Sequence, residues 1–146
     1  MLIGISPILG PEMLFALRSM GHGDEIALVD GNYPAQDHAR RLVRADGVPL
    51  LPLLGAILEI MPIDRNVPDA IFRSALNNDP AQFDRIHHDI DTLCHAMVPD
   101  VAVRALTGAD LYPRIKNAHT IVATSEPCLY ANVILRKGVI TPVVAA

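Results

Sequence analysis

Short strand-like runs and helical segments alternate along this chain, and the alternation limits the folds open to it. Strands are expected at the short apolar runs 25–29, 101–106, 120–123 and 133–135. Helices are expected where apolar residues recur three and four positions apart, at 11–20, 50–60, 80–97 and 110–118. Strands that alternate with helices build a mostly parallel sheet. The sequence therefore predicts one α/β domain, residues 1–146, with a mostly parallel central sheet.

The aspartate that follows the first predicted strand is a candidate ligand-binding residue. Asp30 comes directly after residues 25–29, and open α/β sheets bind ligands at the carboxyl ends of their strands. It shares a strand face with Ile26 and Leu28, where a carboxylate is unfavourable unless it binds something polar. Asp24 lies at the opposite end of the strand, so the two carboxylates cannot line one pocket.

A histidine between two glycines is the second candidate. His22 lies between Gly21 and Gly23, after a predicted helix and before the first predicted strand. The glycines leave the imidazole accessible, and a histidine can both donate and accept a proton near neutral pH. The same pattern fits an ordinary loop histidine near the end of a helix. The residues alone leave both interpretations open.

Two further groups of polar residues carry weaker signals. Tyr130 and Asn132 precede the last predicted strand and could bind a polyol, but they also fit a core tyrosine and a turn asparagine. His87, Asp91 and His95 are spaced four apart and would share one helix face, as zinc ligands do. That face is the polar side of an amphipathic helix and no further ligand is evident, so we expect no metal.

Composition argues against several other classes of function. The net charge is −4 and the sequence has no basic stripe, so nucleic acid is not an expected partner. The longest apolar stretch, 48–58, is interrupted by two prolines and a glycine and is too short to span a bilayer. Residues 1–4 lack the features of a signal peptide, and Cys94 and Cys128 are expected to be buried, reduced thiols. We therefore expect a cytoplasmic protein without a membrane partner. The apolar fraction of 51% favours contact with other copies of the chain.

Several short motifs occur in an order that is typical of one family. The most specific are the run Met20-Gly21-His22-Gly23-Asp24-Glu25 and the element Tyr130-Ala131-Asn132. The other matching elements are Ile5-Ser6-Pro7, Asp30, Pro34-Ala35, Arg44-Ala45-Asp46-Gly47, Asp64, Tyr112, Arg114 and Lys137-Gly138-Val139. With these motifs the chain resembles the RbsD/FucU family of ribose pyranases and L-fucose mutarotases over nearly its whole length. The pattern is closer to the fucose branch.

The resemblance implies a three-layer α/β/α fold of the RbsD type and an isomerase activity. The implied enzyme is a sugar mutarotase that interconverts the anomers of L-fucose or a related free monosaccharide and needs no cofactor. The family's proton-donating histidine matches His22 and its sugar-binding aspartate matches Asp30. Its sugar-binding Tyr-Gly-Asn triplet matches Tyr130, Ala131 and Asn132. Family members form ring-shaped decamers with active sites at subunit contacts, so we expect a homo-oligomer of this kind.

The remaining expectations concern the substrate. Asp64 is expected to be a second polar contact to the sugar. Fucose-type members carry a sugar-contacting arginine where this chain has Gly108, a difference that removes several hydrogen-bond donors. Either the sugar is not L-fucose, or Arg104 or Arg114 replaces that arginine. A non-catalytic monosaccharide-binding protein of the same fold is the alternative function.

Overall fold

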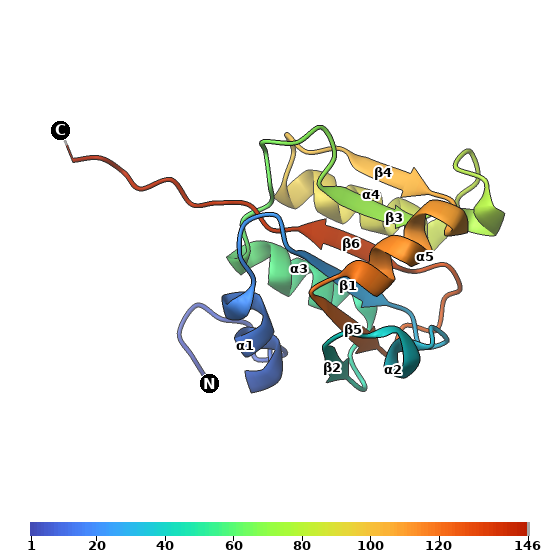
Figure 1. The fold of residues 1–146 in the computed structure, drawn as a ribbon, viewed down its shortest axis with the longest axis horizontal. Coiled ribbons are helices and arrows are strands. Elements are labelled where there is room, and N and C mark those ends of the chain that lie inside the picture. The colour runs from blue at the N-terminus through green and yellow to red at the C-terminus, as the bar shows by residue number, and fades with distance from the viewer. Residues whose placement is uncertain (146) are drawn as a thin grey trace.

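A six-stranded sheet lies at the centre of residues 1–145, the part of the chain that the computed structural model describes (Figure 1). The strand order is β2-β5-β1-β6-β3-β4. The strands are β1 (Glu25–Val29), β2 (Leu42–Ala45), β3 (Ile71–Ser74), β4 (Val103–Leu106), β5 (Thr120–Thr124) and β6 (Val133–Arg136). All of them run in one direction except β6, which is antiparallel to both neighbours. The prediction of a mostly parallel central sheet is confirmed.

The reversed direction of β6 follows from the short connection that precedes it. Residues 125–132 join β5 to β6, and β1 lies between these two strands. A parallel return needs a crossover of about a dozen residues or more, so this loop permits only an antiparallel strand. β6 therefore begins where β1 ends, and Leu28 pairs with Val133. As a result, the loop before β6 lies beside Asp30.

Helices cover both faces of the sheet, which confirms the three-layer α/β/α arrangement. They are α1 (Pro11–Ser19), α2 (Ala35–His38), α3 (Leu50–Ile60), α4 (Arg85–Met97) and α5 (Gly108–Asn117), with a short 3-10 helix at Leu76–Asn78. Ile26 and Leu28 pack in one cluster with α1, α3 and α4, whereas Ala27 and Val29 pack in another with α2 and α5. In Figure 1, α5 lies in front of the sheet and α4 behind it. A strand buried on both faces reads as a continuous apolar run, which explains why β1 is recognisable in the sequence.

Two helices begin at residues other than those expected. α4 begins at Arg85 rather than at residue 80, because Asp84 caps it and its own N–H donates to His87. α5 begins at Gly108, so Pro113 lies inside the helix and not in its first turn. The bounds of α3 agree with the prediction, and α1 ends one residue earlier than expected.

β2 and β3 are not predicted by the local sequence patterns. Polar residues interrupt their short apolar patterns, namely Arg44 in β2 and Arg73 and Ser74 in β3. Arg73 is nevertheless buried, because its guanidinium donates two hydrogen bonds to Asp91 of α4, at 2.7 and 2.9 Å. β3 thus depends on Asp91, a partner distant in the sequence, and a local sequence pattern does not identify such a partner.

The two cysteines differ in their surroundings. Cys94 is buried within α4, as predicted. Cys128 is exposed, contrary to the prediction, because the loop before β6 runs over the surface and leaves its neighbour Leu129 exposed as well. None of the helices in residues 1–145 has both the length and the apolar character needed to cross a membrane.

Candidate active site

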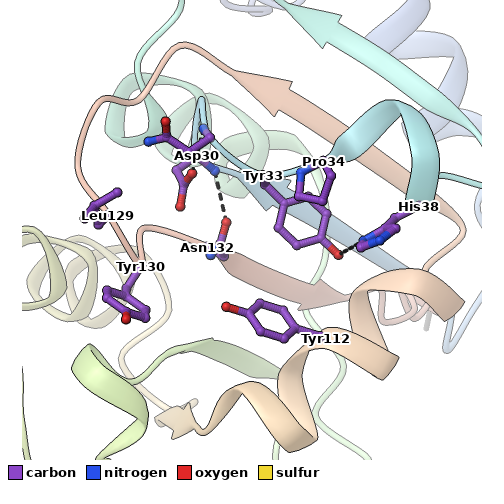
Figure 2. A pocket seen from close by; sticks show the side chains of 9 residues that line it. Asp30, Tyr33, Pro34, His38, Tyr112, Leu129, Tyr130 and Asn132 are labelled. Atoms are coloured by element: carbon purple, nitrogen blue, oxygen red, sulfur yellow. Dashed lines mark hydrogen bonds between the residues drawn. The ribbon is translucent and has the colours of Figure 1, made fainter.

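A pocket opens at the carboxyl end of β1, around Asp30 (Figure 2). It is lined by Asp30, Asn32, Tyr33, Pro34, His38, Tyr112, Leu129, Tyr130 and Asn132. Its volume of about 380 Å³ suits a small-molecule ligand. The lining residues come from the loop after β1, from α2 and α5, and from the loop before β6. The pocket therefore lies at the edge of the sheet where α/β folds bind their ligands.

Asp30 is buried in the wall of this pocket, with 6% of its surface exposed. Its carboxylate accepts a hydrogen bond from the Asn32 N–H at 2.9 Å. The N–H groups of Tyr33 and Ala131 and the Asn132 side chain also stabilise its negative charge. Burial outweighs these contacts and raises the pKa of Asp30 above its ordinary value. The arrangement holds a strong hydrogen-bond acceptor against the pocket.

Asn132 positions Asp30. Its Oδ1 accepts a hydrogen bond from the Asp30 N–H, and its Nδ2 donates to Ser74 Oγ, both at 3.0 Å. The Ser74 N–H in turn donates to the Asn132 carbonyl oxygen at 3.0 Å. Asn132 is buried and thereby links the end of β1 to the end of β3. Its neighbour Ala131 is fully buried and presents its N–H, not its side chain, to Asp30.

Tyr130 lies on the pocket wall with a left-handed backbone, φ 57°, which is uncommon for a bulky residue. His87 of α4 holds this turn, because its Nε2 lies 3.0 Å from the Tyr130 carbonyl oxygen. The Asp84 N–H donates to His87 Nδ1, so the ring carries its proton on Nε2 and donates it to Tyr130. Burial lowers the pKa of His87 and favours this neutral ring. The helical spacing predicts His87 on the polar face of α4, but the residue is fully buried and supports the pocket.

Tyr33, His38 and Tyr112 form the opposite wall of the pocket (Figure 2). The ring of Tyr33 lies 5.3 Å from that of His38 and 6.1 Å from that of Tyr112, centroid to centroid. Burial, together with nearby Tyr112, raises the pKa of Tyr33 to about 12. Neither Tyr33 nor His38 is among the residues predicted from the sequence. Both follow Asp30 within eight positions, and that proximity is the signal that could have identified them.

His22 and Asp64 lie together at the other end of β1. His22 Nε2 is 3.2 Å from Asp64 Oδ2, and Arg136 Nε donates to the same oxygen at 2.9 Å. The Asp64 side chain is 1% exposed, whereas that of His22 is 47% exposed. A hydrogen bond from the Asn66 N–H, and then the Arg136 guanidinium, lower the pKa of Asp64 to about 2. Asp64 is therefore a buried anion that orients an accessible imidazole.

The length of β1 separates these two groups of residues within one chain. His22 precedes the strand and Asp30 follows it. A strand of five residues spans roughly 16 Å. The structure thus brings together Asp30, Tyr130, Ala131 and Asn132, but it places His22 and Asp64 outside their pocket.

The sequence matches the RbsD / FucU transport protein family over residues 3–140. The chain belongs to the RbsD/FucU family. Human fucose mutarotase is 35% identical over 147 residues, which cover 94% of this chain and 93% of the human protein.

Two solved structures of the family have the same fold. The fucose mutarotase of Streptococcus pneumoniae, in complex with L-fucose, is 39% identical, with a TM-score of 0.88 over 96% of this chain and 100% of that one. FucU from Bifidobacterium longum is 32% identical, with a TM-score of 0.86 over 94% and 99% of the two chains. The RbsD/FucU membership predicted from the motifs is confirmed.

Gly108, the position expected to hold an arginine in the fucose branch, lies against two side chains that a larger residue would have to move. A Cβ atom there would come within 2.8 Å of Asn78 Oδ1 and of the Tyr112 ring. The Gly108 N–H also donates to Asn78 Oδ1 at 2.9 Å. An arginine at this position would therefore displace both side chains, and Tyr112 occupies this part of the pocket wall instead.

The two arginines considered as substitutes are engaged elsewhere. Arg104 donates to Asp69. Arg114 forms hydrogen bonds of 2.7 to 3.0 Å with the Glu25 carboxylate and stacks on Phe72 at 3.8 Å. Neither lines the pocket around Asp30 in its own chain.

The alternative metal site on α4 is not supported. Both ring nitrogens of His87 are engaged in hydrogen bonds, and Asp91 is paired with Arg73. Within residues 1–145, no cluster of three or more histidine, cysteine, aspartate or glutamate side chains is arranged to hold a metal ion.

Proposed function

We propose that this protein interconverts the anomers of a free reducing monosaccharide, L-fucose or a related sugar. The observation that carries the proposal is the buried Asp30 in a small-molecule pocket, in a chain that is 39% identical to a fucose mutarotase whose structure contains L-fucose. The Asp30 carboxylate accepts hydrogen bonds from sugar hydroxyls. The rings of Tyr33, Tyr112 and Tyr130 offer faces that pack against the apolar side of a pyranose.

The proposed proton donor is His22 of a neighbouring copy of the chain. His22 lies too far from Asp30 to serve the pocket of its own chain, yet half of its side chain is exposed, and Asp64 orients it. A contact in which the amino end of β1 in one copy meets the carboxyl end of β1 in the next would complete the site. This contact joins two different surfaces, and such contacts generate a closed ring when the rotation from copy to copy closes. The resemblance to the family makes a decamer built from such rings the assembly that we propose.

The proposed chemistry is acid–base catalysis of ring opening. The ring oxygen of the sugar accepts a proton while the anomeric hydroxyl loses one, the bond between the anomeric carbon and the ring oxygen breaks, and a carbonyl forms. Rotation and reclosure on the other carbonyl face give the other anomer, with the protons returned. The sugar is neither oxidised nor reduced, so acid–base groups suffice and the proposed reaction uses neither a metal nor an organic cofactor. Positioned proton transfer of this kind accelerates a reaction about 10²–10⁴-fold.

Measurement of anomer exchange by NMR saturation transfer tests this function. L-fucose, D-ribose, D-galactose and related sugars are equilibrated with the protein, and exchange rates are compared with those of the sugar alone. We expect acceleration for at least one sugar, with L-fucose as the first candidate. If sugars shift the thermal transition of the protein but none exchanges faster, the chain is a non-catalytic monosaccharide-binding protein. If no sugar has either effect, the pocket does not bind monosaccharides and the proposal fails.

A further inference from the structure

The pocket contains a histidine of its own chain, and that histidine is hydrogen-bonded to a tyrosine. His38 Nδ1 and Tyr33 Oη are 2.9 Å apart, and both residues line the pocket with Asp30. In Figure 2, Tyr33 lies between His38 and the side of the pocket that holds Asp30 and Asn132. A ligand held by Asp30 therefore meets Tyr33 before it meets His38.

The local backbone holds the pair in this geometry. Tyr33 precedes Pro34, and the Ala35 N–H donates to the Tyr33 carbonyl oxygen at 2.7 Å. The His38 N–H donates to the Pro34 carbonyl oxygen at 3.2 Å, which closes the single turn of α2. The two rings meet edge to face, at 77°. The turn thus places one ring nitrogen of His38 against the phenol oxygen.

The hydrogen bond between Tyr33 and His38 can run in either direction, and the direction decides whether the phenol offers the pocket an acceptor or a donor. The raised pKa of Tyr33 keeps its phenol protonated throughout the ordinary pH range. When Nδ1 of His38 carries no proton, the Tyr33 phenol donates a hydrogen bond to it and presents oxygen lone pairs to the pocket. When Nδ1 carries a proton, it donates to the phenol oxygen, and the phenol O–H is then available to the pocket. One pair of side chains can therefore serve as base in one direction and as acid in the other.

We propose that Tyr33 and His38 form a proton relay that serves the anomeric hydroxyl of the sugar. The inference rests on the proposed mutarotase function, and it assigns the partner that acts opposite His22 of the neighbouring copy. Ring opening needs one group that supplies a proton and another that removes one. His22 would supply the first, and the Tyr33–His38 pair supplies the second from within the pocket.

The proton and electron changes of the step balance. The anomeric O–H bond breaks and its proton passes to Tyr33 Oη, while the phenol proton passes to His38 Nδ1. The electron pair of the O–H bond forms the carbonyl, and the pair of the ring C–O bond goes to the ring oxygen. The ring oxygen takes a proton from the neighbouring copy's imidazolium. Reclosure reverses each transfer, so both imidazoles return to their starting states and no other reactant is consumed.

The test uses two substitutions that remove opposite ends of the same hydrogen bond. Tyr33→Phe keeps the ring that packs on His38 but removes the hydroxyl. His38→Asn keeps a polar partner for Tyr33 but cannot take up the proton. The full-length protein, the two single variants and the double variant are compared with the sugar that exchanges fastest. The matched control is His95→Asn, at an exposed histidine in the last turn of α4.

We expect each single variant to lower the exchange rate at saturating sugar by about 10- to 100-fold. The sugar Kd, measured by calorimetry, changes by less than about threefold, since Asp30 is intact. The double variant is no slower than the slower single variant, because the two residues act as one unit. His95→Asn exchanges at the wild-type rate.

Three results would overturn the relay while leaving the mutarotase function intact. They are a wild-type rate for His38→Asn, a loss of affinity without loss of rate at saturation, and effects of the two substitutions that multiply in the double variant. If the unaltered protein accelerates exchange of no sugar, the proposed function fails first, and the relay fails with it.

Discussion

The two ends of β1 carry opposite kinds of polar site. At the carboxyl end, N–H groups and an amide surround Asp30, and burial raises its pKa. At the amino end, Asp64 is paired with Arg136 and His22, and its pKa falls to about 2. A carboxylate without a strong cationic contact keeps its acceptor capacity for a ligand, whereas one already paired with a guanidinium has little left to offer. We therefore propose that the carboxyl end of β1 binds the ligand and that the amino end presents an imidazole.

The largest effect is expected at the amino end. His22→Ala should lower the rate of anomer exchange about 10²–10⁴-fold, because the proposed proton donor is lost. The sugar Kd should stay near its wild-type value, since Asp30 and the other residues that line the pocket are intact. Saturation-transfer NMR and calorimetry measure the two quantities separately. An unchanged rate, or a fall in affinity as large as the fall in rate, would contradict this division of roles.

A smaller effect of a different kind is expected at the carboxyl end. Asp30→Asn should weaken sugar binding about 10- to 100-fold, because hydrogen bonds to a charged group are replaced by weaker ones. Removal of a buried charge leaves the thermal stability undiminished. Calorimetric titration checks the affinity, with the exposed Asp46→Asn as the matched control. Wild-type affinity in Asp30→Asn would remove Asp30 from the binding site.

The smallest effects are expected in the pH dependence of folding, where the two carboxyl groups differ in sign. The folded pKa of Asp64 lies below its ordinary 3.8, so its contribution to stability is complete above that value and is lost as the pH falls toward 2. The pKa of Asp30 is raised, so protonation of Asp30 on acidification favours the folded state. Urea unfolding measured between about pH 5 and about pH 2.5, a range that includes the ordinary carboxyl pKa of 3.8, distinguishes the two groups. Asp64→Asn should flatten the loss of stability and Asp30→Asn should steepen it; the same slope in both variants would contradict the comparison.

Local patterns suffice for the elements that are buried on both faces or have clear helical spacing. β1 and α3 occur at the bounds expected from the sequence. β3 is missed because Arg73 interrupts it, and the partner that makes Arg73 compatible with burial, Asp91, is 18 positions away. The start of α4 is misplaced for a related reason, since Asp84 and its bond to His87 decide it rather than Pro80.

In the candidate site too, some features follow from local sequence patterns and others depend on partners distant in the sequence. The position of Asp30 at the end of a strand follows from local reasoning, and the structure places it in a pocket. The role of His87 as a support for Tyr130 could not be predicted, because it depends on how α4 packs against the loop before β6. The separation of His22 from Asp30 follows from the length of β1. The proposed use of His22 by a neighbouring copy depends on an assembly, which a pattern within one chain does not encode.

Mixing two impaired variants tests whether His22 and Asp30 of different copies form one site. His22→Ala and Asp30→Asn are co-expressed, the mixed oligomers are purified, and anomer exchange is measured by saturation-transfer NMR. In a ring built from random mixtures of the two chains, about one quarter of the sites combine an intact His22 with an intact Asp30. At a sugar concentration well below the wild-type Kd, we therefore predict recovery of about a quarter of the wild-type rate, far above that of either variant alone. A mixture no more active than the two variants measured separately would contradict the account.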